Sequence, residues 1–300
     1  MSSRGYGRTR CDDGADGPLG WRPPCSTGHD RPVGRARFEA PTVVVAAGAV
    51  HTPLFLGRSG LGNRRALGRN LRIHPATGVA GVVEGEVAGW RGTMQSYFID
   101  AGWEDHDVML EATNPGPALG ASAMPGFGAP LMGSVAGYRN MLTLGMLVSD
   151  TSAGRVRRLP SGAPFVTYRM NDHDLRNLLW GMALACEVLL AAGAREVLTD
   201  LPGLPKVRSP EEVQRVREGP FRPEHLKLSA YHPMGTARMG ADPARSVTDP
   251  YGRVHGAPGV WVADASLFPT CLGVNPQISI MAFATRTARA IAEAPATRPW

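Results

Sequence analysis

Two short runs of consecutive apolar residues, far apart in the chain, place the strongest constraint on its fold. Residues 42–47 are Thr-Val-Val-Val-Ala-Ala, and residues 260–263 are Val-Trp-Val-Ala. Runs of this length without polar alternation are typical of strands buried on both faces, as in a parallel α/β sheet. Gly48 follows the first run and Asp264 follows the second. We therefore expect two strand-and-helix units that share one parallel sheet.

A helix signal follows the first run. Thr52 suits the N-cap position, and Pro53 suits the first helical residue, because a proline there sacrifices no hydrogen bond. Gly60 is a stop signal, since glycine is common just past the end of a helix. The pattern predicts a short helix that begins after Thr52 and ends before Gly60.

A second helix signal follows the second run. Asn275 is predicted to cap a helix that Pro276 opens and that continues through Ile291. Apolar side chains surround its first turns, so we expect those turns to be buried.

The middle of the chain has a different pattern. Strand-like segments alternate with loops rich in glycine and proline, and the segment at 165–170 alternates as a half-buried antiparallel strand should. A long helix follows, capped by Asn171 or Asp172, with leucines at helical spacing up to Gly193. The predicted strands are residues 79–84, 94–100, 141–148 and 165–170.

These patterns predict a mixed α/β fold with two domains. Residues 41–78 and 230–300 are assigned to a parallel α/β domain, and residues 79–229 to a domain with an antiparallel sheet covered by helices. Residues 1–40 hold few aliphatic side chains, so they cannot bury enough apolar surface to offset their chain entropy. We expect them to form a disordered or atypical N-terminal arm.

Charge and composition exclude several classes of function. The net charge of +6 comes mostly from scattered arginines, with no block of basic residues and no interleaved aromatics, so no nucleic-acid partner is expected. No apolar run of about 20 residues predicts a membrane-spanning helix. The four cysteines show no metal-ligand spacing, so no metal site is expected. A reduced, cytoplasmic setting fits these features best, because no secretory signal is seen at the N-terminus.

His232 is a candidate catalytic base. It stands in the segment His-Pro-Met-Gly-Thr, residues 232–236, where Gly235 permits a tight backbone at a point of close approach. A neutral imidazole is the side chain best suited to take a proton at neutral pH. The alternative interpretation is a hydrogen-bonded structural histidine.

The start of the last helix is a candidate anion site. The amide groups of Gln277 and Ile278 are free in the first turn, where the helix dipole is positive, so they could stabilise negative charge that forms during a reaction. The side-chain NH2 group of Asn275 could hold a substrate hydroxyl while its oxygen caps the helix. The alternative is that Asn275 is only a good cap.

Asp264 ends the second strand, where ligands of α/β proteins bind. Its carboxylate could contact a cofactor there. It could equally be a turn residue that caps the next segment, and the residues alone do not decide between the two.

Three blocks, in order, resemble the glucose–methanol–choline family of flavoprotein oxidoreductases. Residues 48–62 are similar to a family signature, with Phe55 where an aliphatic residue is usual, and residues 68–75 are similar to the loop that follows it. The third block runs from His232 to Asn275 and its helix. The middle of the chain is most similar to the long-chain alcohol oxidase branch, while an asparagine at the position of Asn275 also occurs in a cholesterol oxidase-like branch.

The resemblance implies a fold, a cofactor and a reaction. The fold is an FAD-binding α/β domain with a substrate domain that contains an antiparallel sheet. The reaction is oxidation of an alcohol to an aldehyde or ketone, with hydride passed to flavin N5, His232 as base and Asn275 as the second active-site residue. The substrate expected is a long-chain or bulky apolar alcohol. The cofactor contacts implied are Ala47, Gly48, Asp264, Ala265, Asn275, Pro276 and Gln277.

One expected motif is missing. The family begins with a strand, a Gly-x-Gly-x-x-Gly turn and a helix that cradle the FAD pyrophosphate, and no such turn occurs here apart from an isolated Gly5-Tyr6-Gly7 with no strand before it. We therefore expect a fragment, or one part of a split protein whose N-terminal FAD-binding half is a separate chain. The alternative is an inactive truncated remnant with a structural or partner role. A serine hydrolase is disfavoured, because Gly-x-Ser-x-Gly is absent.

Overall fold

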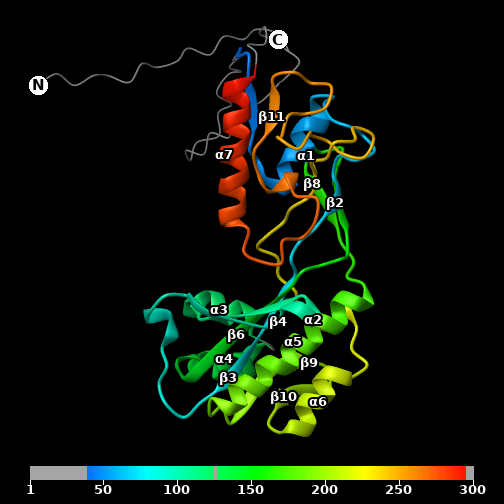
Figure 1. Cartoon of the computed structure of the whole chain (residues 1–300). Helices are drawn as coiled ribbons and strands as arrows, with labels where there is room; N and C mark the ends of the chain where they lie inside the picture. Colours follow the sequence, from blue (N-terminus) through cyan, green and yellow to red (C-terminus); the bar gives the residue numbers. More distant parts are fainter. Residues whose placement is uncertain (1–38, 125–126, 295–300) are drawn as a thin grey trace, which may run out of the picture.

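The computed structural model describes residues 39–124 and 127–294, so the predicted N-terminal arm lies almost wholly outside the described residues. Figure 1 shows two lobes, which we name by their sheets. The parallel-sheet lobe contains the first helix and the last helix, and the antiparallel-sheet lobe contains the middle of the chain. The mixed α/β class predicted from the sequence is confirmed.

The two apolar runs form the parallel pair that the sequence predicts. β1 (Val43–Val45) lies beside β11 (Val260–Val262) in parallel, with Val43 opposite Val260. The helix α1 (Gly48–Arg58) follows β1 directly. Side chains of both strands and of α1 share one buried apolar cluster, so this contact holds together segments from opposite ends of the described chain.

The predicted start of α1 is wrong by one turn. The helix begins at Gly48, and Thr52 and Pro53 lie inside it. Pro53 has no amide hydrogen, so the carbonyl group of Ala49 loses its helical donor. The hydroxyl group of Thr236 donates to this carbonyl instead, at 2.6 Å. A tertiary contact thus compensates for the donor that the proline lacks. Local sequence signals could not reveal this contact, because Thr236 is far from α1 in the sequence.

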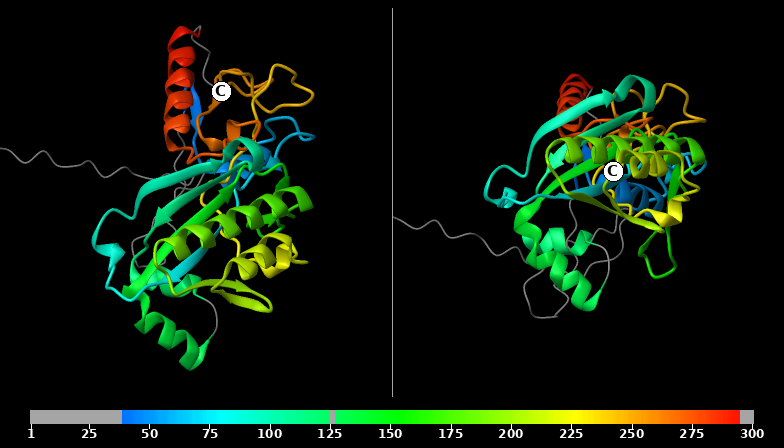
Figure 2. Two further views of the ribbon diagram at one scale, coloured as in Figure 1. Left: turned by 60° about the horizontal axis from the view of Figure 1, so that its bottom comes forward. Right: turned by 90° about the horizontal axis from the view of Figure 1, so that it is seen from below.

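The antiparallel-sheet lobe is built on six strands in the order β10-β9-β3-β6-β5-β4. The long helix α5 (Asp172–Ala191) packs along one face of this sheet, and Figure 2 shows it from two further sides. The side chain of Asn171 caps α5 by accepting from the amide of Asp174, as predicted. The strands are β3 (Ala76–Val82), β4 (Gln95–Gly102), β5 (Val108–Thr113), β6 (Met141–Val148), β9 (Glu196–Leu201) and β10 (Leu204–Val207).

A third sheet packs against α1. It consists of β2 (Arg69–Leu71), β7 (Gly154–Arg158) and β8 (Pro164–Thr167), all antiparallel. β8 corresponds to the segment 165–170 that was predicted as a strand of the middle region. It pairs with β7 rather than with the large sheet, and both strands contact α1 of the parallel-sheet lobe.

Short helices complete the described chain. The best defined is α6 (Pro210–Glu218), whose first turn is capped by the side chain of Ser209. The others are η1 (Gly89–Arg91), α2 (Trp103–His106), α3 (Pro117–Ala123), α4 (Gly128–Ala136), η2 (Tyr138–Asn140), η3 (Pro223–His225) and η4 (Ala265–Leu267).

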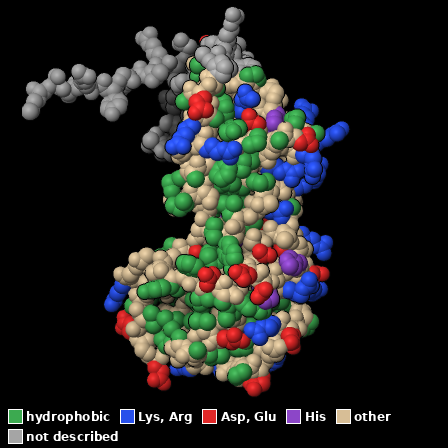
Figure 3. All heavy atoms as spheres, viewed as in Figure 1, with side chains coloured by type: hydrophobic (Ala, Val, Ile, Leu, Met, Phe, Trp, Pro, Cys, Tyr) green, Lys and Arg blue, Asp and Glu red, His purple; other side chains and the backbone are tan. Residues whose placement is uncertain are grey.

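Two expectations for the last helix are wrong. α7 spans Gln277–Glu293 with Pro276 at the N-cap position, and the side chain of Asn275 makes no capping hydrogen bond. The first turns are exposed rather than buried, since Ile278 is 73% and Met281 51% accessible. Figure 3 shows hydrophobic side chains on the surface of this lobe. The first turns of α7 do carry apolar side chains, but no other described residues pack over Ile278 and Met281.

Among the described residues, none of the helices has both the length and the apolar character needed to cross a bilayer. The location of the protein in the cell stays a prediction.

Candidate active site

Asp264 connects the ends of the two parallel strands. One carboxylate oxygen accepts from the amide of Gly48 at 3.0 Å and from the hydroxyl group of Thr52, and the other accepts from the amide of Ser266 at 2.8 Å. The predicted strand-end residues Gly48 and Asp264 therefore lie together, with Ala47 and Ala265 beside them in the chain. The side chain of Asp264 caps η4, and both of its oxygens accept hydrogen bonds from residues of this chain. These bonds are those of a turn residue that caps the next segment, which was one of the two interpretations of Asp264.

The loop that carries His232 lies against this strand end. The amide of Gly235 donates to the carbonyl of Ala265 at 3.1 Å. Gly235 has a φ of +89°, and a Cβ atom there would overlap the carbonyl oxygen of Asn70, so the close approach predicted for this glycine is confirmed. With Thr236 bonded to α1, the loop is fixed on both sides.

The ring of His232 contacts a second imidazole. Its Nδ1 atom lies 3.0 Å from Nδ1 of His74, and the ring centroids are 5.1 Å apart. Burial lowers the pKa of His232. Burial, together with the neighbouring His232, lowers the pKa of His74 to about 4, while the backbone of Gly273 acts to raise it. Both rings are thus neutral at neutral pH.

His74 is held in an unusual backbone conformation. Its φ is +49°, in the left-handed region that non-glycine residues seldom adopt. Both oxygens of the buried Asp150 carboxylate accept backbone amides here, from Ile73 and His74, each at 3.2 Å. Tyr168 also donates to Asp150, at 2.9 Å. Such a conformation persists only where surrounding contacts fix it, and it is frequent at functional sites.

Asn275 contacts the antiparallel-sheet lobe. Its Nδ2 atom donates to Glu111 on β5 at 2.7 Å, and the other Glu111 oxygen accepts from Gln95 at 2.7 Å. Burial raises the pKa of Glu111, and the hydrogen bond from Asn275 partly opposes that shift. The Oδ1 atom of Asn275 is buried and has no hydrogen-bond partner among the described residues. A buried acceptor without a donor is costly, so this oxygen is available to accept a hydrogen bond from a bound group.

One apolar cluster supports these elements. Met234 of the histidine loop and Ala265 after β11 pack with Phe268, and Ile280 and Phe283 of α7 pack against them. The first turn of α7, at the predicted contacts Pro276 and Gln277, is therefore joined to the loop that carries the histidine.

The structure connects the predicted residues His232 and Asn275 through other residues rather than by direct contact. No hydrogen bond links His232 to Asn275 among the described residues. The connection runs through His74, whose ring contacts His232 and is influenced by Gly273, two positions before Asn275. Sequence reasoning missed the roles of His74, Glu111 and Asp150 here. The only signal was His74 within the block at 68–75.

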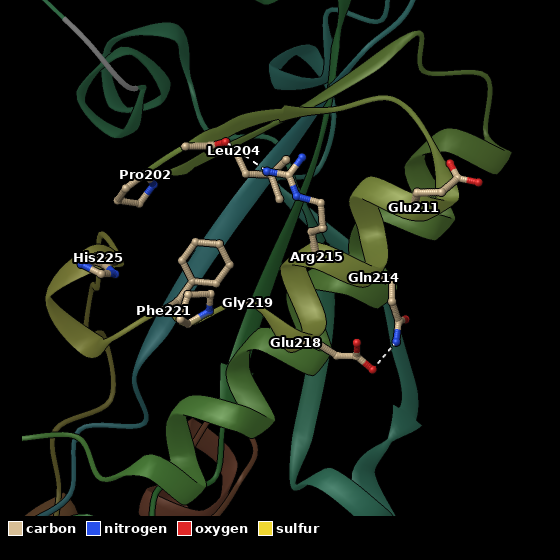
Figure 4. A pocket seen from close by; sticks show the side chains of 11 residues that line it. Pro202, Leu204, Glu211, Gln214, Arg215, Glu218, Gly219, Phe221 and His225 are labelled. Atoms are coloured by element: carbon tan, nitrogen blue, oxygen red, sulfur yellow. Dashed lines mark hydrogen bonds between the residues drawn. The ribbon is translucent and has the colours of Figure 1, made fainter.

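Two of the surface cavities formed by the described residues lie away from this region. The larger, of about 440 Å³, is formed by β10, α6 and η3 with Arg215, Phe221 and His225 on its wall (Figure 4). The second, of about 360 Å³, lies between the loops that follow α1 and precede β11. Neither is lined by a predicted site residue, so the candidate site rests on side-chain contacts rather than on these cavities.

Comparison with known proteins identifies the family of this chain. Models of the GMC oxidoreductase family match residues 25–76 and 150–284, together more than half of the chain. A GMC-type oxidoreductase of Mycobacterium tuberculosis is 43% identical over 83% of this chain and 39% of its own length. A long-chain-alcohol oxidase of Arabidopsis thaliana is 31% identical over 82% of this chain and 36% of its own length.

Solved structures show the same fold. Pyridoxine 4-oxidase from Mesorbium loti superposes with a TM-score of 0.59 at 20% identity, over 85% of this chain and 52% of that protein. The chain thus spans between about a third and a half of the proteins it matches. On the two family matches and these relatives, the chain belongs to the GMC oxidoreductase family.

Proposed function

We propose that this chain supplies the catalytic residues for FAD-dependent oxidation of an alcohol CH–OH group to an aldehyde or ketone. The observation that carries the proposal is the His232 ring. It is half-buried, neutral and held at Nδ1 by His74, and its Nε2 atom has no hydrogen-bond partner among the described residues. A general base needs such a free lone pair, together with a pKa at or below the working pH.

The residues present fit the flavin part of FAD. The orphaned Oδ1 atom of Asn275 can accept a hydrogen bond, and the amides of Gln277 and Ile278 at the start of α7 can donate. The positive end of α7 favours negative charge beside it. Bound flavin would supply the acceptor for the hydride that leaves the alcohol carbon.

His232 would take the hydroxyl proton at Nε2. Its lowered pKa keeps the imidazole unprotonated at neutral pH, so the base is ready without an activating carboxylate. Asn275 would orient the substrate. One of its two Nδ2 hydrogens is bonded to Glu111, which leaves the other to hold the substrate oxygen.

We propose a long-chain or bulky apolar alcohol as substrate. The support is the similarity to plant proteins named long-chain-alcohol oxidases, at 28–31% identity. The substrate domain would comprise the antiparallel-sheet lobe, with the FAD-binding portions in the parallel-sheet lobe, as the sequence predicts.

We further propose that a partner chain completes the parallel sheet. This partner would correspond to the N-terminal part of the relatives, which this chain does not match. Among the described residues β1 pairs only with β11, and Val44 at its centre is 48% accessible. The exposed face of α7 lies in the same lobe. That partner would carry the pyrophosphate-binding turn that this sequence lacks. The same exposed surface also favours the second candidate, an inactive remnant with a partner role.

Complementation tests the proposal. The chain would be co-expressed with the N-terminal portion of the Mycobacterium tuberculosis relative, and the purified complex assayed for flavin absorbance and for oxidation of primary alcohols of increasing length. We expect flavin binding and turnover, and His232→Ala should lower kcat/KM by about 100- to 10,000-fold while flavin stays bound.

The matched control is His51→Ala, because His51 lies exposed on α1 and should leave turnover unchanged. A complex that binds flavin but does not oxidise any alcohol would contradict the catalytic role and support the inactive remnant. Equal turnover in His232→Ala and wild type would remove His232 from the role of base.

A further inference from the structure

The six-stranded sheet has one face that α5 covers and one face that it does not. Val79 of β3 and Leu144 of β6 belong to the buried apolar cluster that α5 closes. Because successive residues of a strand point to opposite faces, Gly78 and Gly145 belong to the other face, which we call the open face. These two glycines lie directly opposite each other on the two central strands. The open face therefore lacks side chains at the middle of the sheet.

No described side chain fills the place above these glycines, which we call the glycine gap. Gly78 is exposed although its strand has a neighbour on each side. A Cβ atom on Gly78 would lie within 4 Å of backbone atoms of β6 alone, and one on Gly145 would have Cγ2 of Thr113 as its nearest atom, at 3.3 Å. Neither glycine has a positive φ, so neither is required by its backbone conformation. The absence of side chains here leaves space rather than permitting a turn.

Apolar side chains border the glycine gap on both sides along the strands. The side nearer His74 is a small buried cluster of three residues, Ala76, Met109 and Leu147. On the far side, Ala80 packs against a second cluster that contains Met141. The hydroxyl group of Thr143 also lies on the far side, where it donates to the carbonyl of Thr113 and is thus already satisfied. The gap is one row of residues wide, and its walls suit an apolar occupant.

The glycine gap adjoins the candidate active site. In the register of the sheet, Glu111 of β5 lies beside Gly145. Glu111 accepts a hydrogen bond from Asn275, the residue proposed to hold the substrate oxygen. From Glu111, two strand spacings, or about 10 Å, lead across Gly145 to Gly78. A substrate held at Asn275 therefore has the gap as its neighbouring surface.

We propose that the glycine gap binds the apolar tail of the substrate, so that Gly78 and Gly145 determine which alcohols are accepted. The inference rests on the proposed function for the kind of substrate and assigns the part of the chain that selects it. A gap one row wide between apolar walls fits an unbranched alkyl chain better than the several side chains of a partner polypeptide. Each methylene group that leaves water there should strengthen binding about three- to fourfold.

Methyl NMR tests the site on the full chain, without any flavin. The methionine methyl groups would be labelled with carbon-13, and the chain titrated with 1-decanol or with 1-butanol. We expect 1-decanol to shift the signal of Met109, which borders the gap, and to leave that of Met182, on the α5 side of the sheet, unchanged. 1-Butanol at the same concentration should shift neither signal. Each signal is identified by its loss in a Met→Leu variant.

Filling the glycine gap should remove the binding. Gly78→Val and Gly145→Val each add a side chain that suits a strand, and either should abolish the effect of 1-decanol on Met109. The matched control is Gly85→Val, because Gly85 is exposed outside the sheet and a Cβ atom there would meet nothing within 4 Å. In the complemented complex, Gly145→Val should lower kcat/KM for 1-decanol by about 10- to 100-fold and leave that for 1-butanol within about twofold.

The outcomes separate this inference from the proposed function. An unshifted Met109 signal in the wild type would overturn the inference, and so would an equal shift in the folded valine variants. If a valine variant does not fold, the corresponding alanine variant replaces it, with a smaller loss of binding expected. Loss of the 1-decanol effect once the complex has formed would assign the gap to the partner polypeptide and also overturn the inference.

The complex adds the complementary test. Binding of 1-decanol at the gap without oxidation of any alcohol would contradict the proposed function and leave the apolar site intact. Oxidation with the same preference for 1-decanol over 1-butanol in Gly145→Val and wild type would support the proposed function and refute the role of the glycines.

Discussion

The buried ring of His74 makes the stability of the chain depend on pH. Its pKa in the folded state is about 4, against 6.5 for an ordinary histidine, mainly because burial disfavours the charged ring. Between these values the unfolded chain binds a proton that the folded chain does not. The stabilisation is therefore fully present above pH 6.5 and is lost as the pH falls towards 4.

We expect His74→Gln to reduce this pH dependence. Between pH 7.5 and pH 5 the wild type should lose about 2 kcal/mol more free energy of unfolding than the variant, because glutamine does not titrate. Urea unfolding at the two pH values measures this difference. His51→Gln should behave as wild type. Equal losses in His74→Gln and wild type would show that folding does not lower the pKa of His74.

At the residue scale the sequence indicated the parts of the site that lie within one motif. His232 and Gly235 are three positions apart, and the tight backbone at Gly235 was predicted from the residues beside it. The partners of His232 and Asn275 could not be predicted, because His74 is 158 positions and Glu111 164 positions away from them. Such pairs depend on how the two lobes meet, which no local pattern encodes.

At the scale of elements, the sequence predicted which segments form strands and helices better than where they begin or what covers them. The helical pattern of α7 was correct, but periodicity shows only that a face is apolar. Whether Ile278 is covered depends on other polypeptide, and here it is 73% accessible. For α1, the signals at Thr52 and Pro53 suggested a start that tertiary bonds to Asp264 and Thr236 override.

The compensation for Pro53 in α1 can be tested by a double-mutant cycle. Thr236→Val removes the hydroxyl that bonds to the carbonyl of Ala49, and should cost about 1–3 kcal/mol because a buried acceptor is left without a partner. Pro53→Ala restores the helical amide donor, so the double variant should regain much of that loss. Urea unfolding of all four proteins gives the coupling.

A strictly additive cycle would contradict this account of α1. Thr52→Val cannot serve as the comparison, because its hydroxyl bonds to Asp264. The exposed Thr285, whose hydroxyl donates to a carbonyl within α7, is a suitable control. Thr285→Val combined with Pro53→Ala should show no coupling, since the two sites share no hydrogen-bond partner in the described chain.

At the scale of the whole molecule, the two lobes differ in how well their sheets are supported. β6 has a paired strand on each side and lies under α5, within the largest buried apolar cluster. β1 and β11 have three residues each, and among the described residues β1 pairs only with β11, whose other side is bonded by the segment 252–254. The candidate site draws on both lobes, because Asn275 reaches Glu111 on β5 while His232 is tied to the end of β11. Its geometry therefore depends on the less supported lobe.

We expect hydrogen exchange to separate the lobes. Backbone amides of β1 and β11 should exchange faster than those of β6 and α5, because a pair of three-residue strands, in which β1 has a free edge and Val44 is 48% accessible, opens at lower free energy than a strand paired on both sides. Mass spectrometry of peptides from residues 43–56, 141–148, 175–189 and 260–268 measures this. Adding the N-terminal portion of the Mycobacterium tuberculosis relative should slow exchange in β1 by pairing its free edge, and should leave α5 unchanged. Uniform exchange across the four peptides would mean that the lobes unfold as one unit, and that the parallel pair is stable without further strands.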